Sequence, residues 1–139
     1  MTITRQHLTV GEDGQPVPIT NDPDGNPFPR IPVISYAVTH GDTVHLSGIT
    51  AHPLGPSRGI RAQTREVLGR IDELLAGAGT DKSKLLTAQV WLADMGDFSE
   101  HNREWNAWVD LANPPVRACV QATLILPVLL VEIMVTAAR

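Results

Sequence analysis

Two charged side chains lie within the most apolar part of the sequence and carry its strongest indication of chemistry. Arg117 stands at the start of a predicted β-strand over residues 118–124, and Glu132 lies inside a second predicted strand over residues 129–137. The planar guanidinium of Arg117 matches a small carboxylate through two parallel hydrogen bonds. A glutamate among apolar neighbours is costly to bury unpaired, and it can handle a proton or a water beside a reacting carbon. Two interpretations stay open: the charges form a structural ion pair or face water, or they belong to a carboxylate-binding site.

The other reactive side chains form no known catalytic or metal-binding motif. Cys119 has no suggested histidine and aspartate partners, so a small strand residue that fills space is the favoured interpretation. The sequence contains neither a glycine-rich phosphate loop before a helix nor a Gly-x-Ser-x-Gly elbow. No two histidines have metal-ligand spacing beside a carboxylate, so no metal is predicted and surface or loop positions are favoured for all of them: His7, His40, His45, His52 and His101.

The composition is typical of one globular domain in a reducing cytoplasm. The chain has 139 residues, of which 42% are hydrophobic, and its single cysteine excludes an internal disulfide. A net charge of −4 and a pI near 5.6, with scattered basic residues, argue against a nucleic-acid partner. The N-terminus lacks the apolar core of a signal peptide. The longest apolar run, residues 122–133, contains Pro127 and Glu132 and is too short to span a membrane.

The first 32 residues differ in composition from the rest. Their repeated prolines and glycines exclude helix, and Asp24-Gly25 indicates a tight turn between short extended pieces. Scattered apolar residues, among them Ile3 and Phe28, favour an ordered arm over a mobile leader. We therefore predict a Pro/Gly-rich arm over residues 1–32 and a folded domain over residues 33–139.

Strand and helix patterns alternate from Val33 onward. Residues 33–39 and 43–47 predict a hairpin, and Gly48 directly after it marks a place where the backbone approaches another group closely. Apolar residues at helical spacing predict a helix from Ile60 to Ala78, ended by Gly79, with its charges on a solvated face.

The second half of the domain repeats this alternation. Residues 85–92 predict a strand with Leu86 on its apolar face. Asp97 and Glu100 resemble a capping box that opens a second helix through about Trp108. The predicted inward stripe of that helix is Phe98, His101 or Asn102, Trp105, and Trp108 or Val109.

The order β-β-α-β-α-β-β describes an α+β domain in which two helices cover one face of a mostly antiparallel sheet. A sheet with only one face covered by helices usually finds a partner for the other face. We therefore expect a homo-oligomer with sites between its subunits.

Several segments together resemble the RidA/YjgF family, also described as endoribonuclease L-PSP-like, and most closely its YoaB-like branch. The likeness covers roughly residues 33–139, and the order and spacing of the segments are more specific than any one of them. The segments are Gly41-Asp-Thr-Val-His-Leu-Ser-Gly48, Gln63-Thr-Arg with Val67-Leu68 and Ile71, Trp91-Leu-Ala-Asp-Met-Gly-Asp-Phe98 with Asn102, Trp105-Asn-Ala-Trp108, Pro115-Val-Arg-Ala-Cys119 and Val131-Glu-Ile133.

This resemblance implies a chorismate-mutase-like α+β fold assembled as a homotrimer with clefts between neighbouring subunits. It implies hydrolysis of reactive enamines and imines, such as those released from amino acids by pyridoxal phosphate enzymes, to a 2-keto acid and ammonia. The implied ligand is a small imine or keto acid that carries a carboxylate, and no metal or organic cofactor is required.

The resemblance also implies roles for particular residues. Arg117 corresponds to the arginine that holds the substrate carboxylate, and Glu132 to the glutamate that orients or activates water. Asn102 falls at a recurrent site asparagine, and Gly48 and Cys119 fall where backbone groups line the pocket.

The sequence departs from the family pattern at two of these places. Ile34 falls where many members have a pocket tyrosine, with Tyr36 nearby, and Met134 replaces a second glutamate common in the last strand. Ile34 and the unusual first 32 residues favour an alternative, a non-catalytic trimer that binds a small carboxylate metabolite or a protein partner through the same cleft.

Overall fold

A computed structural model describes residues 1–9, 15, 32–52 and 58–139 of the chain. The parts of the predicted arm that lie outside these ranges, including the Asp24-Gly25 turn, are not described. The elements are β1 (Ile3–Leu8), β2 (Ser35–His40), β3 (Thr43–Leu46), β4 (Ile49–Thr50), α1 (Ile60–Gly77), η1 (Lys82–Lys84), β5 (Leu85–Leu92), η2 (Met95–Asp97), α2 (Phe98–Trp108), β6 (Val116–Gln121) and β7 (Val131–Ala138).

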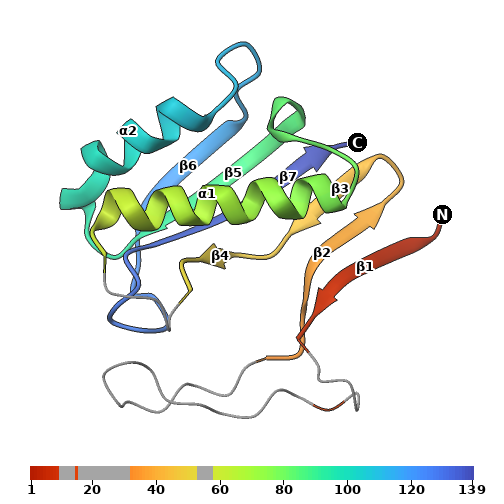
Figure 1. Ribbon diagram of the computed structural model, residues 1–139, viewed down its shortest axis with the longest axis horizontal. Coiled ribbons are helices and arrows are strands. Elements are labelled where there is room, and N and C mark those ends of the chain that lie inside the picture. The colour runs from red at the N-terminus through yellow and green to blue at the C-terminus, as the bar shows by residue number, and fades with distance from the viewer. Residues whose placement is uncertain (10–14, 16–31, 53–57) are drawn as a thin grey trace.

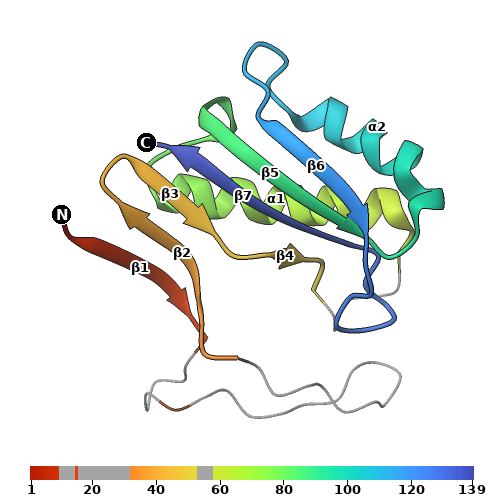
Figure 2. The same cartoon turned by 180° about the vertical axis from the view of Figure 1, so that it is seen from behind.

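The strands form one sheet in the order β1-β2-β3-β7-β5-β6, with the short β4 also paired to β7. Every pairing is antiparallel except that between β5 and β6. Both helices lie on one face of the sheet, as the front and back views show (Figures 1 and 2). The predicted α+β architecture, a mostly antiparallel sheet covered on one face by two helices, is therefore confirmed.

The first strand of the sheet comes from the predicted N-terminal arm. β1 pairs antiparallel with β2, so residues 3–8 are an edge strand of the sheet and not only a covering segment. Beyond it, the Thr9 N–H donates to the Ile34 carbonyl at 2.8 Å, and the Ile34 N–H donates to the Thr9 hydroxyl at 2.7 Å. The two ends of the segment between β1 and β2 are therefore fastened together.

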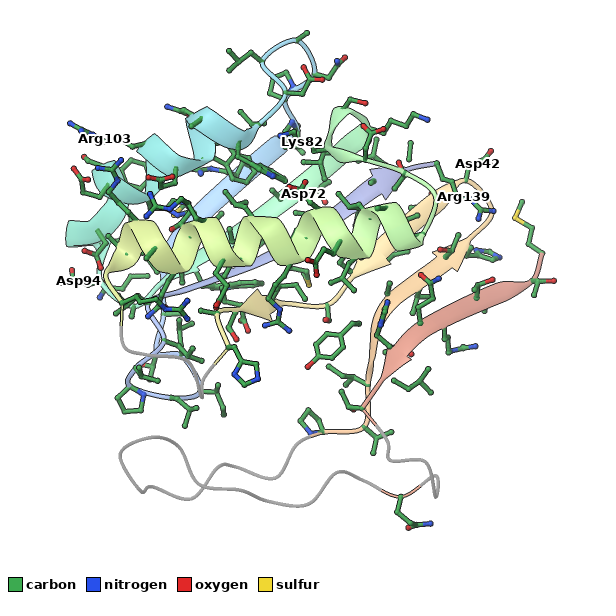
Figure 3. The ribbon with its side chains drawn as sticks, in the orientation of Figure 1. Asp42, Asp72, Lys82, Asp94, Arg103 and Arg139 are labelled. Atoms are coloured by element: carbon green, nitrogen blue, oxygen red, sulfur yellow. The ribbon has the colours of Figure 1, made fainter. Side chains whose placement is uncertain are left out.

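The β2–β3 hairpin forms as predicted. Its turn contains Gly41 at φ +60, a left-handed conformation that glycine adopts without steric cost. The chain returns to the same end of the sheet at its C-terminus, where the Arg139 N–H donates to the Asp42 carbonyl at 2.9 Å. Figure 3 labels both residues at this end.

Helix α1 supplies much of the core. Its inward residues Ile60, Val67, Leu68, Ile71 and Leu75 are all buried, because they recur at the spacing that places side chains on one helical face. After the helix Gly79 has φ +81, so the predicted glycine stop is confirmed.

The buried Gln63 of α1 fastens the segment that leads into β7. Its amide donates to the Val128 carbonyl at 2.9 Å, and its carbonyl oxygen accepts the Leu130 N–H at 2.9 Å. This side chain therefore helps to set where β7, the strand that carries Glu132, begins.

Strand β5 has the predicted bounds, but the first buried side chain of its apolar face is Leu85 and not Leu86. A register irregularity between Leu85 and Thr87 buries Leu85 and leaves Leu86 46% exposed, so the predicted face for Leu86 is wrong. Downstream, Ala88, Val90 and Leu92 are buried as predicted.

Helix α2 also forms where it was predicted, with Asp97 at its N-cap position, but the capping contacts differ. The Asp97 side chain makes no capping hydrogen bond, so the predicted capping box is wrong. Instead Asp94 accepts the Gly96 N–H at 2.8 Å and caps the short turn η2 that leads into the helix. On the inward face His101 and Trp105 are buried, whereas Phe98 is 38% exposed.

The last two strands are not neighbours, because β5 lies between β6 and β7. The face of these strands away from the helices keeps apolar side chains at the surface: Val116 is 70% exposed, Val120 48% and Met134 42%. Within the described residues, no helix is long and apolar enough to cross a membrane.

Candidate functional site

The guanidinium of Arg117 is held by three side chains of helix α2. One Nη2 hydrogen is donated to Asn102 Oδ1 at 2.8 Å, and Nη1 lies 3.4 Å from His101 Nε2. The plane of Trp105 lies beneath, with the Arg117 Cζ atom 4.9 Å from the ring centroid. We call Arg117, His101, Asn102 and Trp105 the arginine half-site.

This arrangement leaves donors for a ligand. A guanidinium has five N–H groups, and α2 engages one on each terminal nitrogen. Among the described residues no carboxylate lies within ion-pair distance of Arg117. Half-burial lowers the pKa of Arg117 below its usual range, but an arginine remains charged near neutral pH. The half-site is therefore a positive group with a partly free donor edge.

Cys119 follows on the same strand and face as Arg117. Burial raises the pKa of its thiol, and the nearby Arg117 charge opposes this rise without reversing it. Near neutral pH the side chain is therefore a thiol, which agrees with the interpretation of a space-filling strand residue over a nucleophile.

His101 is the part of this site that the sequence missed. Its side chain is fully buried, its Nδ1 lies 3.0 Å from the Thr64 hydroxyl of α1, and Thr64 is itself fully buried. Burial, followed by the neighbouring Arg117 charge, lowers the pKa of His101 from 6.5 to about 4. The expectation of a surface or loop position is wrong for this histidine; its position on the inward stripe, next to Asn102, was the signal available.

Glu132 of β7 lies with a different group of residues. A Cβ built on Gly48 would lie 3.0 Å from Glu132 Cδ and 3.1 Å from Oε1, so only a glycine lets the backbone approach the carboxylate this closely. Next to it, the buried hydroxyl of Ser47 has no hydrogen-bond partner among the described residues. Burial raises the pKa of Glu132 above its usual range. We call Glu132, Gly48 and Ser47 the glutamate half-site.

The two half-sites project to opposite faces of the sheet. Arg117 is in register with Ala88, which is in register with Val135, and both of these are buried beneath the helices. Glu132 is in register with Trp91, whose side chain alternates to the other face. The structural ion pair between Arg117 and Glu132 that the sequence left open therefore does not form within one chain.

The remaining predicted site residue, Ile34, belongs to neither half-site. It precedes β2, is 38% exposed, and its backbone is bonded to Thr9.

The charged face of α1 is more engaged than the sequence predicted. Arg61 Nε and Arg65 Nη1 lie 2.8 Å and 3.0 Å from the same oxygen of Glu104, which α2 presents between them. At the other end of the helix pair, Trp108 Nε1 donates to Asp72 at 2.9 Å and Lys82 Nζ lies 5.4 Å from the Trp108 ring. Figure 3 labels Asp72 and Lys82. These contacts fasten α2 to α1, and thereby fix the helix that holds Arg117.

Sequence comparison assigns the family. Residues 29–139 match the family described as endoribonuclease L-PSP. The chain belongs to this family. The RutC family protein YoaB of Escherichia coli is 38% identical over 104 residues, which cover 75% of this chain and 89% of that protein. A RutC family protein of Haemophilus influenzae is 53% identical over 75 residues, which cover 54% of this chain and 65% of that relative.

Solved structures of the endoribonuclease L-PSP family, also called RidA/YjgF, support the same assignment. A YjgF family member from Neisseria meningitidis is 40% identical and superposes with a TM-score of 0.74 over 81% of this chain and 92% of that chain. A RidA from an Antarctic Psychrobacter is 26% identical, with a TM-score of 0.73 over 81% and 93%. The predicted membership in the RidA/YjgF family, close to YoaB, is confirmed.

Proposed function

We propose that the protein hydrolyses reactive enamines and imines that carry a carboxylate, giving a 2-keto acid and ammonia. The observation that carries this proposal is the guanidinium of Arg117, which α2 holds in place with donors to spare and no carboxylate of the described residues beside it. A pre-oriented guanidinium binds a carboxylate without first having to lose its own conformational freedom.

The proposed site lies between copies of the chain. Because the arginine and glutamate half-sites project to opposite faces of one sheet, a cleft that uses both needs Arg117 from one copy and Glu132 from its neighbour. The exposed apolar side chains of Val116, Val120 and Met134 give copies a surface through which to associate. We propose a homotrimer, in which each copy contributes to two such clefts.

The chemistry needs few groups once the substrate is held. Arg117 binds the carboxylate and fixes the imine carbon next to a water. Glu132 accepts a proton from this water as its oxygen bonds to carbon, and returns that proton to the nitrogen, which gives a carbinolamine. Glu132 then takes the carbinolamine hydroxyl proton as the carbonyl forms, and delivers it to the nitrogen as the carbon–nitrogen bond breaks and ammonia leaves. Because burial raises the pKa of Glu132, the carboxylate is an effective base only above that raised value.

The direct test follows ammonia release from freshly generated 2-iminobutanoate. The wild-type protein is expected to accelerate release, and Arg117→Ala is expected to lose most of this acceleration. Arg103→Ala is the matched control, because this α2 arginine is 68% exposed and contacts Glu100 at 3.6 Å, away from the half-site. If wild-type protein leaves the rate unchanged, the proposed reaction is wrong.

A second candidate, a trimer that binds a small carboxylate without turning it over, is favoured by Ile34 at the position where many family members have a tyrosine. Benzoate affinity, measured beside ammonia release, separates the two functions. Binding that depends on Arg117, in a protein that fails to release ammonia, would favour the binding function.

A further inference from the structure

His101 lies between two groups that dictate which of its ring nitrogens carries a proton. Arg117 Nη1 is 3.4 Å from His101 Nε2, and the Thr64 hydroxyl is 3.0 Å from His101 Nδ1. A guanidinium can only donate hydrogen bonds, whereas a hydroxyl can donate or accept. The Nε2 atom must therefore be the acceptor, and the ring proton belongs on Nδ1, where it is donated to Thr64.

The surroundings favour a neutral ring. His101 and Thr64 are fully buried, so an imidazolium would lack water and would face the Arg117 charge. The other charged groups nearby on α1 and α2 are engaged elsewhere, since Arg61 and Arg65 both contact Glu104. On β6, the thiol of Cys119 adds no charge near neutral pH.

The contacts to Arg117 come from one rigid element. His101, Asn102 and Trp105 occupy two successive turns of α2, so a hydrogen-bond acceptor for each terminal nitrogen and an aromatic ring beneath are presented together. Asn102 alone would leave the guanidinium free to turn about its own bonds. The acceptor on His101 fixes the second terminal nitrogen.

We propose that His101 is a positioning residue: as the neutral Nδ1–H tautomer, it holds Arg117 so that its remaining donors face a ligand carboxylate. The inference builds on the proposed carboxylate role of Arg117, and it deepens that role by adding a residue that does not touch the ligand. Thr64 takes part by accepting the hydrogen bond from Nδ1–H, which keeps the ring proton on Nδ1 and leaves Nε2 as an acceptor.

The tautomer is measurable without any ligand. In ¹⁵N-labelled wild-type protein near neutral pH, long-range proton–nitrogen correlations of the His101 ring are expected to show a proton on Nδ1 and none on Nε2. Rotation about the Cζ–Nη bonds of Arg117, followed by ¹⁵N exchange, is expected to be slow. A proton on Nε2, or on both ring nitrogens, would overturn the proposal.

Two variants separate positioning from packing. His101→Gln keeps an acceptor close to the Nε2 position, whereas His101→Leu fills the space without one. We expect the leucine variant to weaken benzoate binding by about tenfold or more and to release Arg117 rotation. The glutamine variant is expected to retain most of both properties. If His101 only fills space, the order reverses, because leucine suits a buried apolar position better than glutamine.

The test of the role of His101 does not depend on turnover. Should the wild-type protein fail to release ammonia while tautomer, rotation and variant order are as expected, the proposed reaction fails and the role of His101 stands. Slow rotation and unchanged benzoate affinity in His101→Leu would refute the role of His101, whatever the turnover.

Discussion

At the scale of single residues, the surroundings of a side chain determine what it can do. Arg117 is half-buried but keeps donors available because its immediate partners are neutral acceptors and a ring, not a carboxylate. Glu132 has the opposite surroundings, since burial, with no cationic partner among the described residues, raises its pKa. A paired Arg117 and Glu132 would cancel each other, and their separation keeps both available for a ligand.

Neutral His101 makes the stability of the fold depend on pH. Its pKa is about 4 in the folded protein and near 6.5 when unfolded, so between these values the unfolded state binds more protons. The free energy of unfolding is therefore unaffected by this group above pH 6.5. It falls as the pH drops from 6.5 towards 4, by up to about 3 kcal/mol. Denaturant unfolding of wild type and His101→Gln at several pH values measures the difference. An identical slope in both proteins over this range would contradict the prediction.

At the scale of elements, the close approach of the segment between β3 and β4 to β7 places Glu132. Alanine at position 48 would bring a Cβ within 3.0 Å of Glu132 Cδ, so the carboxylate must move. We expect Gly48→Ala to lower turnover by about threefold or more, because the carboxylate must give way by a few tenths of an ångström and a misplacement of about 1 Å can cost about a hundredfold. The free energy of unfolding should change little, since the end of a flexible side chain can adjust.

Gly69→Ala is the matched control for this glycine. Gly69 lies in the middle of α1, and a Cβ there meets nothing within 4 Å. This change should raise stability by about 0.5–1 kcal/mol through helix propensity and leave turnover unaltered. If both alanine variants retain full turnover, the Gly48 backbone does not position the glutamate.

At the scale of the whole molecule, the proposed cleft can be tested by mixing inactive variants. Arg117→Ala and Glu132→Ala should each lack turnover, because each removes one half-site. When trimers assemble at random from equal amounts of the two variants, about a quarter of all clefts draw an intact Arg117 and an intact Glu132 from neighbouring copies. Turnover near that fraction of wild type is expected after co-refolding.

Mixing without exchange of subunits is the control, and mass measurement establishes the number of chains. If co-refolded variants stay inactive although mixed trimers form, both half-sites must come from one copy. A monomer by mass would exclude the shared cleft altogether.

Local pattern was enough to predict much of the fold. Helix α1 and strand β5 lie where periodicity placed them, and the hairpin turn at Gly41 and the stop at Gly79 follow from local backbone chemistry. The paired ends of β1 and β2 were harder to predict, since the intervening residues give no periodic signal. The bulge that turns Leu86 outward also has no local signature.

The sequence by itself determined the two candidate residues, Arg117 and Glu132, because charges in apolar strands stand out in any conformation. Only the tertiary structure decided that they project to opposite faces, since this depends on β5 lying between their strands. It also decided the contacts of His101, whose partners lie 37 and 16 residues away along the chain. Strand order and contacts over such separations arise from packing of the whole core, which no local pattern encodes.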